Sequence, residues 1–414
     1  MKLLAYITMT IVFVTTLYSS TTPKVVLYNE TFFNNDKYTM ESMRGSVDKK
    51  ENVFSNKLRL RLYTDITDDL YFSTTGVYKY NNLSDIYIRD LIENKGYKTN
   101  ETYFESLYFT YRLISKLHLT AGLVNFSDGS YVEISELDYV KGSGLSKLAD
   151  IFLEAVFLTW NGDVGDWETI TKLGYGTYNK IGISKSSTVS KVVGDSTGYY
   201  MLYEMYKGFD SIKFNYYKAD LRKNGIPVAR ENVIGVGFNK YFLKSGINIF
   251  STLGYSKSHI EPSVLSRYKT PPPNPFGPPV ITPQLLFPNA FVTDRTETHG
   301  YLYSLGVNKD FSSNLIESYS IGMDYTHTTD NWYSFVNNDV SDYYNTRNMN
   351  GGNYHTWITV RPTKNVAIKT YYNIVNVSNA HAIGNLTVGI PHSDSLVPAV
   401  KKINRLGIKL IIKY

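Results

Sequence analysis

Residues 57–63 read KLRLRLY, and this stretch indicates the fold. Side chains of a β-strand alternate between two faces, so the three leucines share one face. The opposite face carries three basic residues, Lys57, Arg59 and Arg61. The same alternation recurs in residues 106–112, 212–217, 319–326 and 366–374. One such strand also fits a soluble sandwich, but its repetition along the chain predicts many strands with one apolar and one polar face.

The lengths of the connections alternate as well. Short polar links near residues 65–68, 114–116, 161–166, 207–211, 243–246, 309–314 and 361–365 separate longer segments near residues 81–100, 127–150, 179–198, 221–231, 258–298, 329–353 and 378–402. Short turns on one side and long loops on the other are typical of a barrel that spans the bacterial outer membrane. Nothing in the fold of a soluble β-protein requires short and long connections to alternate along the chain.

Strand parity predicts the size of the barrel. About fifteen strands lie between Lys57 and Tyr414, and an even number is needed to close a bacterial barrel with both ends on one side. We therefore expect about sixteen strands in an all-β, closed, antiparallel transmembrane barrel. The additional first strand falls at Lys24–Thr31 or at Thr39–Val47, and the sequence leaves both open.

Composition excludes several other classes. The 414 residues contain no Cys, which removes disulfide frameworks, Cys-ligated zinc and thiol nucleophiles. A formal net charge of +6 is too small and too evenly spread to indicate nucleic-acid binding. After the first 20 residues no apolar run approaches the length of about 20 residues that a spanning helix needs.

The N-terminus predicts the compartment. Met1 and Lys2 precede an apolar run from Leu3 to Val14, followed by small polar residues up to Thr21. This order predicts a secretory signal peptide over residues 1–20, and a retained membrane anchor is the alternative. Residues 21–52 then form an N-terminal segment that holds the first strand or a plug, and residues 53–414 form the barrel.

No enzymatic or metal site is evident. The seven histidines are scattered without the short spacing of a metal site, and neither a phosphate-binding loop nor a nucleophile elbow occurs. We therefore expect a protein that is not an enzyme and that has no cofactor or metal.

The last ten residues carry the most specific pattern. Apolar side chains occupy every second position back from the terminal aromatic: Tyr414, Ile412, Leu410, Ile408 and Leu406. This pattern resembles the C-terminal signature of bacterial outer-membrane β-barrels, which implies recognition by the barrel-assembly machinery. We expect these residues to be the assembly signal.

The chain as a whole resembles the bacterial outer-membrane porins of Gram-negative bacteria, the general-diffusion type. Ser106–Gly129 (SLYFTYRLISKLHLTAGLVNFSDG) is similar to the porin pattern of paired strands, a small turn and a Gly-containing second strand. The resemblance implies a water-filled channel in the outer membrane for passive diffusion of ions and small hydrophilic solutes. It also implies outer-membrane lipid and lipopolysaccharide as surroundings, and it is compatible with a homotrimer, although trimer and monomer both stay open.

Two other functions stay open. The barrel could be a substrate-selective channel, or it could only anchor an adhesin or receptor that presents its long loops. The loop over residues 258–298 holds nine of the fourteen prolines, so it cannot be a spanning strand. We expect it to be an exposed outer loop, with a fold into the lumen or a contact to a neighbouring barrel as alternatives.

Selectivity is expected to come from charges on the inner wall. Candidates for a pore-lining basic wall are Lys57, Arg59, Arg61, Arg112, Lys369, Arg405 and Lys409. In porins that the chain resembles, the third outer loop folds inward, and here this loop carries the acidic residues Asp128, Glu133, Glu136 and Asp138. A basic wall facing an acidic loop predicts mild anion preference, or weak selectivity if the charges balance. Alternatively, these acids stay solvated on an exposed loop.

Overall fold

A computed structural model describes residues 23–42, 45–83, 97–128, 149–178, 196–223, 226–260, 297–329, 332, 335–336, 349–380 and 399–414. Among them, no helix meets the length and hydropathy needed to span a membrane.

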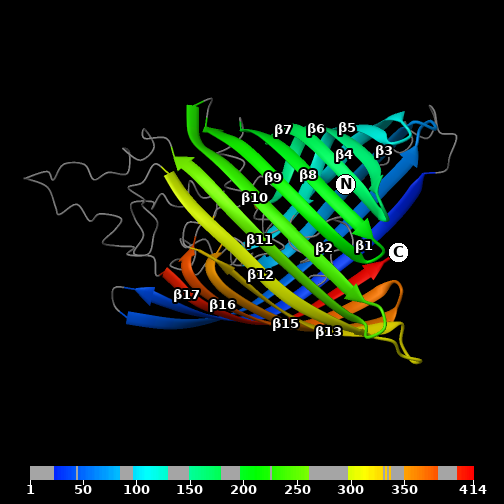
Figure 1. The fold of residues 1–414 in the computed structure, drawn as a ribbon. Coiled ribbons are helices and arrows are strands. Elements are labelled where there is room, and N and C mark those ends of the chain that lie inside the picture. The colour runs from blue at the N-terminus through cyan, green and yellow to red at the C-terminus, as the bar shows by residue number, and fades with distance from the viewer. Residues whose placement is uncertain are drawn as a thin grey trace, which may run out of the picture.

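Strands make up nearly all of the described chain (Figure 1). They are β1 (Lys24–Ser42), β2 (Gly45–Asp65), β3 (Leu70–Leu83), β4 (Tyr97–Ile114), β5 (Leu117–Asp128), β6 (Ala149–Val164), β7 (Trp167–Tyr178), β8 (Thr197–Lys207), β9 (Asp210–Lys223), β10 (Ile226–Phe242), β11 (Ile247–Ile260), β12 (Glu297–Phe311), β13 (Ser318–Thr328), β14 (Phe335–Val336), β15 (Met349–Thr363), β16 (Val366–Ala380) and β17 (Ala399–Lys413). All except the two-residue β14 form the wall of one barrel.

Each wall strand pairs antiparallel with the next, and β1 pairs with β17 to close the ring. In this closing pair Tyr28 lies opposite Lys413 and Asp36 lies opposite Arg405. Closure thus gives each described wall strand a paired neighbour on both sides, as a sheet in hydrocarbon requires. The prediction of a closed, antiparallel, 16-stranded barrel is confirmed. Of the two candidate first strands, Lys24–Thr31 lies within β1, whereas Thr39–Val47 is divided between β1 and β2.

The connections differ in length between the two ends of the barrel. At one end every turn is short, for example residues 115–116, 165–166 and 208–209. At the other end most connections are longer, but only residues 224–225 separate β9 from β10. Most of the expected long loop at residues 221–231 therefore belongs to these two strands, which extend beyond their neighbours as a hairpin.

Side-chain burial is reversed relative to a soluble protein. On β9, Ile212 and Phe214 are exposed, whereas Lys213 and Asn215 between them are buried. The same contrast recurs around the wall: large apolar side chains make up the exposed outer face, and the buried inner face is rich in Ser, Thr, Asn and charged residues. An apolar exterior around a polar interior is the pattern of a barrel that crosses a membrane.

Candidate functional site: the inner wall of the barrel

The basic residues of β2 lie on the inner wall, where they contact acidic residues. Lys57 and Arg59 are 1% and 4% exposed. Lys57 Nζ lies 2.8 Å from Glu105 Oε1, and Arg59 Nε donates to Glu105 Oε2 at 3.0 Å. The two cations therefore share one carboxylate of β4, reached across the intervening strand β3.

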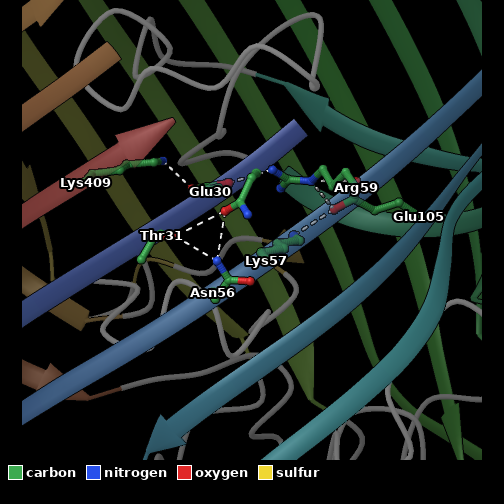
Figure 2. Close-up of polar contacts among 8 residues, drawn as sticks. Glu30, Thr31, Asn56, Lys57, Arg59, Glu105 and Lys409 are labelled. Carbon is green, nitrogen blue, oxygen red and sulfur yellow. Dashed lines mark hydrogen bonds and ion pairs between the residues drawn. The ribbon is translucent and has the colours of Figure 1, made fainter. Parts of the chain in front are cut away.

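A second carboxylate extends this network to the closing seam. Arg59 also donates to Glu30 Oε2 on β1 at 2.6 Å, and Lys409 Nζ on β17 lies 2.5 Å from Glu30 Oε1 (Figure 2). The seam network thus runs Lys57–Glu105–Arg59–Glu30–Lys409 and joins four strands. Three cations and two carboxylates leave a small positive excess, so the inner wall is not an uncompensated basic column.

A β-bulge turns Glu105 toward the lumen. Thr75 of β3 pairs with Ser106 and Gly76 pairs with Phe104, so Glu105 is the extra residue between them. Strict alternation would not place Glu105 and Ser106 both on the buried face, yet both are buried. The bulge therefore supplies the carboxylate on which Lys57 and Arg59 converge.

The other basic candidates have different surroundings. Arg405 on β17 donates to Asp36 Oδ1 on β1 at 3.0 Å, and both side chains are buried. Arg61 stacks over the Tyr63 ring, 5.4 Å from its centroid. Arg112 is exposed at the short-turn end of the barrel, 4.0 Å from Asp69. Arg112 thus lies away from the seam network.

Lys369 belongs to an aromatic and charged cluster on the inner wall at β13, β15 and β16. Its ammonium lies 3.3 Å from His355 Nε2 and 5.3 Å from the centroid of the Trp357 ring. His355 Nδ1 lies 3.1 Å from Asp324 Oδ2 on β13. Because Lys369 has only donors, the arrangement fits a neutral His355 that accepts from Lys369 and donates to Asp324.

This cluster is accommodated by a small residue on a neighbouring strand. A Cβ atom at Gly322 of β13 would lie 2.1 Å from the Trp357 ring. The missing side chain therefore lets the indole lie flat against the inner wall. No group of three or more metal-ligating side chains occurs in the described part of the chain.

The predicted acidic loop lies mostly beyond the described residues. Asp128 is the last residue of β5 and pairs with Ala149 of β6. Glu133, Glu136 and Asp138 lie outside the described residues, as does most of the Pro-rich loop, residues 261–296. The acidic side of the expected constriction stays a prediction.

The predicted assembly residues lie on the outer face of β17. Leu406, Ile408 and Tyr414 are exposed, and Leu410 and Ile412 are half-buried on the same face. The backbone of Tyr414 exchanges two hydrogen bonds with Leu27 of β1, at 2.8 and 3.3 Å. The C-terminal residue therefore takes part in barrel closure.

A small polar cluster occurs on the outer face of β1 and β2. Asn56 Nδ2 donates to Asn29 Oδ1 at 2.8 Å and to Thr31 Oγ1 at 2.7 Å (Figure 2). On β17, Ile412 and Leu410 lie opposite Asn29 and Thr31. The Asn29–Thr31–Asn56 cluster therefore interrupts an otherwise apolar outer surface.

Sequence reasoning missed the acidic members of the inner wall. Glu30 and Asp36 lie in the N-terminal segment at residues 21–52, where the sequence alone does not locate the first strand, and Glu105 lies in the bulge. For Glu30 and Asp36 a signal exists, since both share a face with Tyr28, Phe32 and Asn34 once a strand over the whole segment is assumed. No period-2 pattern identifies Glu105.

Comparisons with known proteins agree with this architecture. No protein-family model matches the sequence, and no curated protein matches it. Among solved structures, Pseudomonas putida OprB superposes with a TM-score of 0.54 at 10% identity, covering 95% of this chain and 94% of that one. An anion-selective porin from Comamonas acidovorans gives 0.51 at 9% identity, covering 95% and 100%. The chain has the closed 16-stranded β-barrel fold of bacterial outer-membrane porins.

Proposed function

We propose that this protein is an outer-membrane channel, not an enzyme, through which ions and small hydrophilic solutes diffuse passively. The observation that carries the proposal is the closed ring of sixteen strands with a polar, charged inner face and an apolar outer face. A barrel of about eight strands fills with its own side chains, whereas one of about sixteen leaves an aqueous lumen.

The charges of the inner wall support weak ion selectivity. Glu105 and Glu30 offset most of the charge on Lys57, Arg59 and Lys409, and Asp36 offsets Arg405. Rings of one sign bias which ions pass, but here the two signs nearly balance. We expect a slight anion preference from the remaining positive charge.

Single-channel recording of the refolded protein in a planar bilayer tests the proposal. We expect stable steps with a linear current–voltage relation. A barrel that is correctly folded, as shown by its altered gel mobility before heating, but that carries no current would contradict the channel and favour a barrel that only anchors surface loops.

A substrate-selective channel is the second candidate. The observation that favours it is the cluster of Trp357, Tyr371, Lys369 and His355, which combines aromatic faces with charge on the inner wall. A solute-binding site typically combines aromatic surface with a small number of precisely placed polar groups. Solute flux that saturates in liposome swelling would support this candidate, whereas flux that rises linearly with concentration supports passive diffusion.

The proposed surroundings follow from the outer face. Its exposed apolar side chains fit the lipid and lipopolysaccharide of an outer membrane, and the outer face of β17 fits recognition by the assembly machinery. We further propose self-association as a homotrimer. The Asn29–Thr31–Asn56 cluster supports this, because polar side chains facing hydrocarbon are better accommodated at a contact between subunits.

A further inference from the structure

Glu231 of β10 is a buried acidic residue without a basic partner. Its side chain is 1% exposed, and its Oε2 atom has no hydrogen-bond partner. The other buried acidic residues that the structure describes, Asp36, Glu105 and Glu204, each form an ion pair with a basic side chain at 2.8 to 3.1 Å. A carboxylate that is held away from water without a counter-charge is costly. A cationic group bound at Glu231 would remove this cost.

Ser258 of β11 supplies a second acceptor at the same place on the inner wall. It lies directly opposite Glu231, is 1% exposed, and its Oγ atom has no hydrogen-bond partner either. Side chains that lie directly opposite in an antiparallel pair have Cβ atoms about 4.5–5.5 Å apart, so one small group can contact both. On the other side of Glu231, β9 contributes only the methyl group of Ala219. A carboxylate and a hydroxyl therefore lie together on this part of the wall, and the hydroxyl does not bond to the carboxylate.

The surroundings of Glu231 on the described wall are small or aromatic. Gly198 of β8 pairs with Ala219, and a Cβ atom at Gly198 would meet a single described atom within 4 Å, the backbone oxygen of Lys218 at 3.4 Å. The next inward-facing pair on these strands is Tyr200 and Tyr217, whose rings stack with their centroids 5.2 Å apart. Diagonal neighbours on one face of a sheet are within reach of aromatic side chains. A few polar groups beside aromatic surface are typical of a binding site for a small molecule.

We propose that Glu231 and Ser258 bind the primary ammonium group of a small solute. An ammonium group has three N–H donors and no acceptor, which matches the two carboxylate oxygens and the hydroxyl oxygen. Hydrogen bonds between an ammonium group and a carboxylate are stronger than those between neutral groups. The stacked tyrosines offer a surface for the carbon skeleton of the solute. This inference rests on the proposed channel function and names a class of solute for it, amines.

Thermal unfolding of the detergent-solubilised barrel tests the binding site without any need for conductance. The probes are n-propylammonium chloride and tetramethylammonium chloride at equal ionic strength, which carry the same charge, although only the first has N–H donors. A ligand that binds the folded state raises the unfolding temperature. We expect n-propylammonium to raise it in the parent and tetramethylammonium to have little effect.

The variant Glu231→Gln should need about 10-fold more n-propylammonium for the same rise, because a neutral amide cannot form the charge-assisted bond. Glu154→Gln is the control, since it makes the same change at an exposed position beside the exposed Val156 on β6, and it should respond as the parent does. If Glu231→Gln does not fold, Ser258→Ala removes the hydroxyl alone and should weaken the response. Equal responses of the parent and the folded variant would overturn the site.

Single-channel recording in potassium chloride tests whether the site takes part in transport. We expect n-propylammonium to lower the potassium conductance of the parent in a saturable way, and the half-effective concentration to rise about 10-fold in Glu231→Gln. A conducting barrel in which the amine acts equally on the parent and on Glu231→Gln would refute the site in the pore. A barrel that n-propylammonium stabilises selectively but that carries no current would support the ammonium site and refute the channel function instead.

Discussion

At the scale of single residues, the inner wall is governed by pairing between charges. Glu105 is 1% exposed and is shared by Lys57 and Arg59. A buried charge that loses its partner is costly, because the remaining charge stays away from water. We therefore expect the residues to which we assign a role in selectivity to be important for folding as well.

Replacing Glu105 with Gln should expose this dual role. Arg59 would keep its contact with Glu30, whereas Lys57 would lose its contact with the Glu105 carboxylate. With one negative charge removed from the inner wall, the reversal potential in a salt gradient should shift toward anions. Loss of one partner of a buried ion pair costs on the order of 3 kcal/mol, so the barrel should also unfold at lower temperature. Glu168→Gln, at an exposed position beside a turn, is the control and should change neither measurement.

Charge reversal at Arg59 and Arg61 should have unequal effects. Arg61→Glu should shift the reversal potential toward cations while the barrel still folds, since Arg61 lies outside the seam network. Arg59→Glu would place a third carboxylate beside Glu30 and Glu105, and we expect poor assembly.

Recording at several salt concentrations checks this prediction. The shift of the reversal potential in Arg61→Glu should become smaller as the salt concentration rises, because the Debye screening length, about 10 Å at 0.1 M, becomes shorter. An unchanged reversal potential in conducting Arg61→Glu protein would contradict a role for this side of β2 in the pore.

At the scale of elements, β17 combines assembly and closure. Its outer face carries Leu410 and Ile412, and Tyr414 bonds to Leu27 of β1. Deleting Tyr414, or replacing Leu410 and Ile412 with Asp, should prevent insertion. A charge on the lipid face is destabilising, by about 2–4 kcal/mol for a basic residue at the membrane centre and by less for an acidic one, and the signal for the assembly machinery would be lost as well. The measurement is the amount of heat-modifiable barrel in outer membranes. Lys402→Asp, on an exposed residue of the same strand, should insert normally.

The hairpin of β8 and β9 should make folding sensitive to acid. At this turn the Lys240 ammonium, which contacts Asp210, and the Tyr241 amide, which donates to it at 2.9 Å, lower the pKa of the Asp210 carboxyl below its ordinary value of 3.8. The stabilisation is therefore fully present above pH 3.8 and is lost as the pH falls toward the lower folded-state pKa.

Asp210→Asn removes this titration. Compared with the parent, the variant should be less stable at pH 7, and the difference should narrow below pH 3.8. Thermal unfolding of parent and variant at pH 7 and below pH 3.8 measures this difference in stability. A difference that stays constant with pH would contradict the role of the Asp210 carboxylate.

At the scale of the whole molecule, the outer surface should determine self-association. Replacing the polar cluster by Asn29→Leu, Thr31→Val and Asn56→Leu gives a uniformly apolar surface that lipid solvates well, so the barrel should still fold. If subunits meet at this face, the variant should be monomeric where the parent is trimeric in light scattering of detergent-solubilised protein. Phe33→Leu, exposed on the same face of β1, is the control and should keep the parent's oligomeric state.

Much of the barrel follows from the sequence alone. Alternating apolar and polar residues, as in Lys57–Tyr63 and Leu406–Tyr414, predict strands whose two faces meet lipid and water, and strand parity predicts closure. These features depend only on local chemistry: each strand has a period of two, and hydrocarbon requires every backbone group to be paired. The same pattern predicts that Lys57, Arg59 and Arg405 face inward, as they do in the structure.

Contacts between distant segments depend on the tertiary structure. The bulge at Glu105 shifts the alternation by one residue, and whether a strand bulges there depends on its neighbour β3. Arg405 meets Asp36 only because closure brings together segments 369 residues apart, and the pairing of β14 with β6 likewise joins segments far apart in the sequence. A period-2 pattern specifies which way a side chain points but not which strand lies opposite. The barrel and its two faces therefore follow from the sequence alone, whereas register and closure, which belong to the tertiary structure, decide which charges are paired.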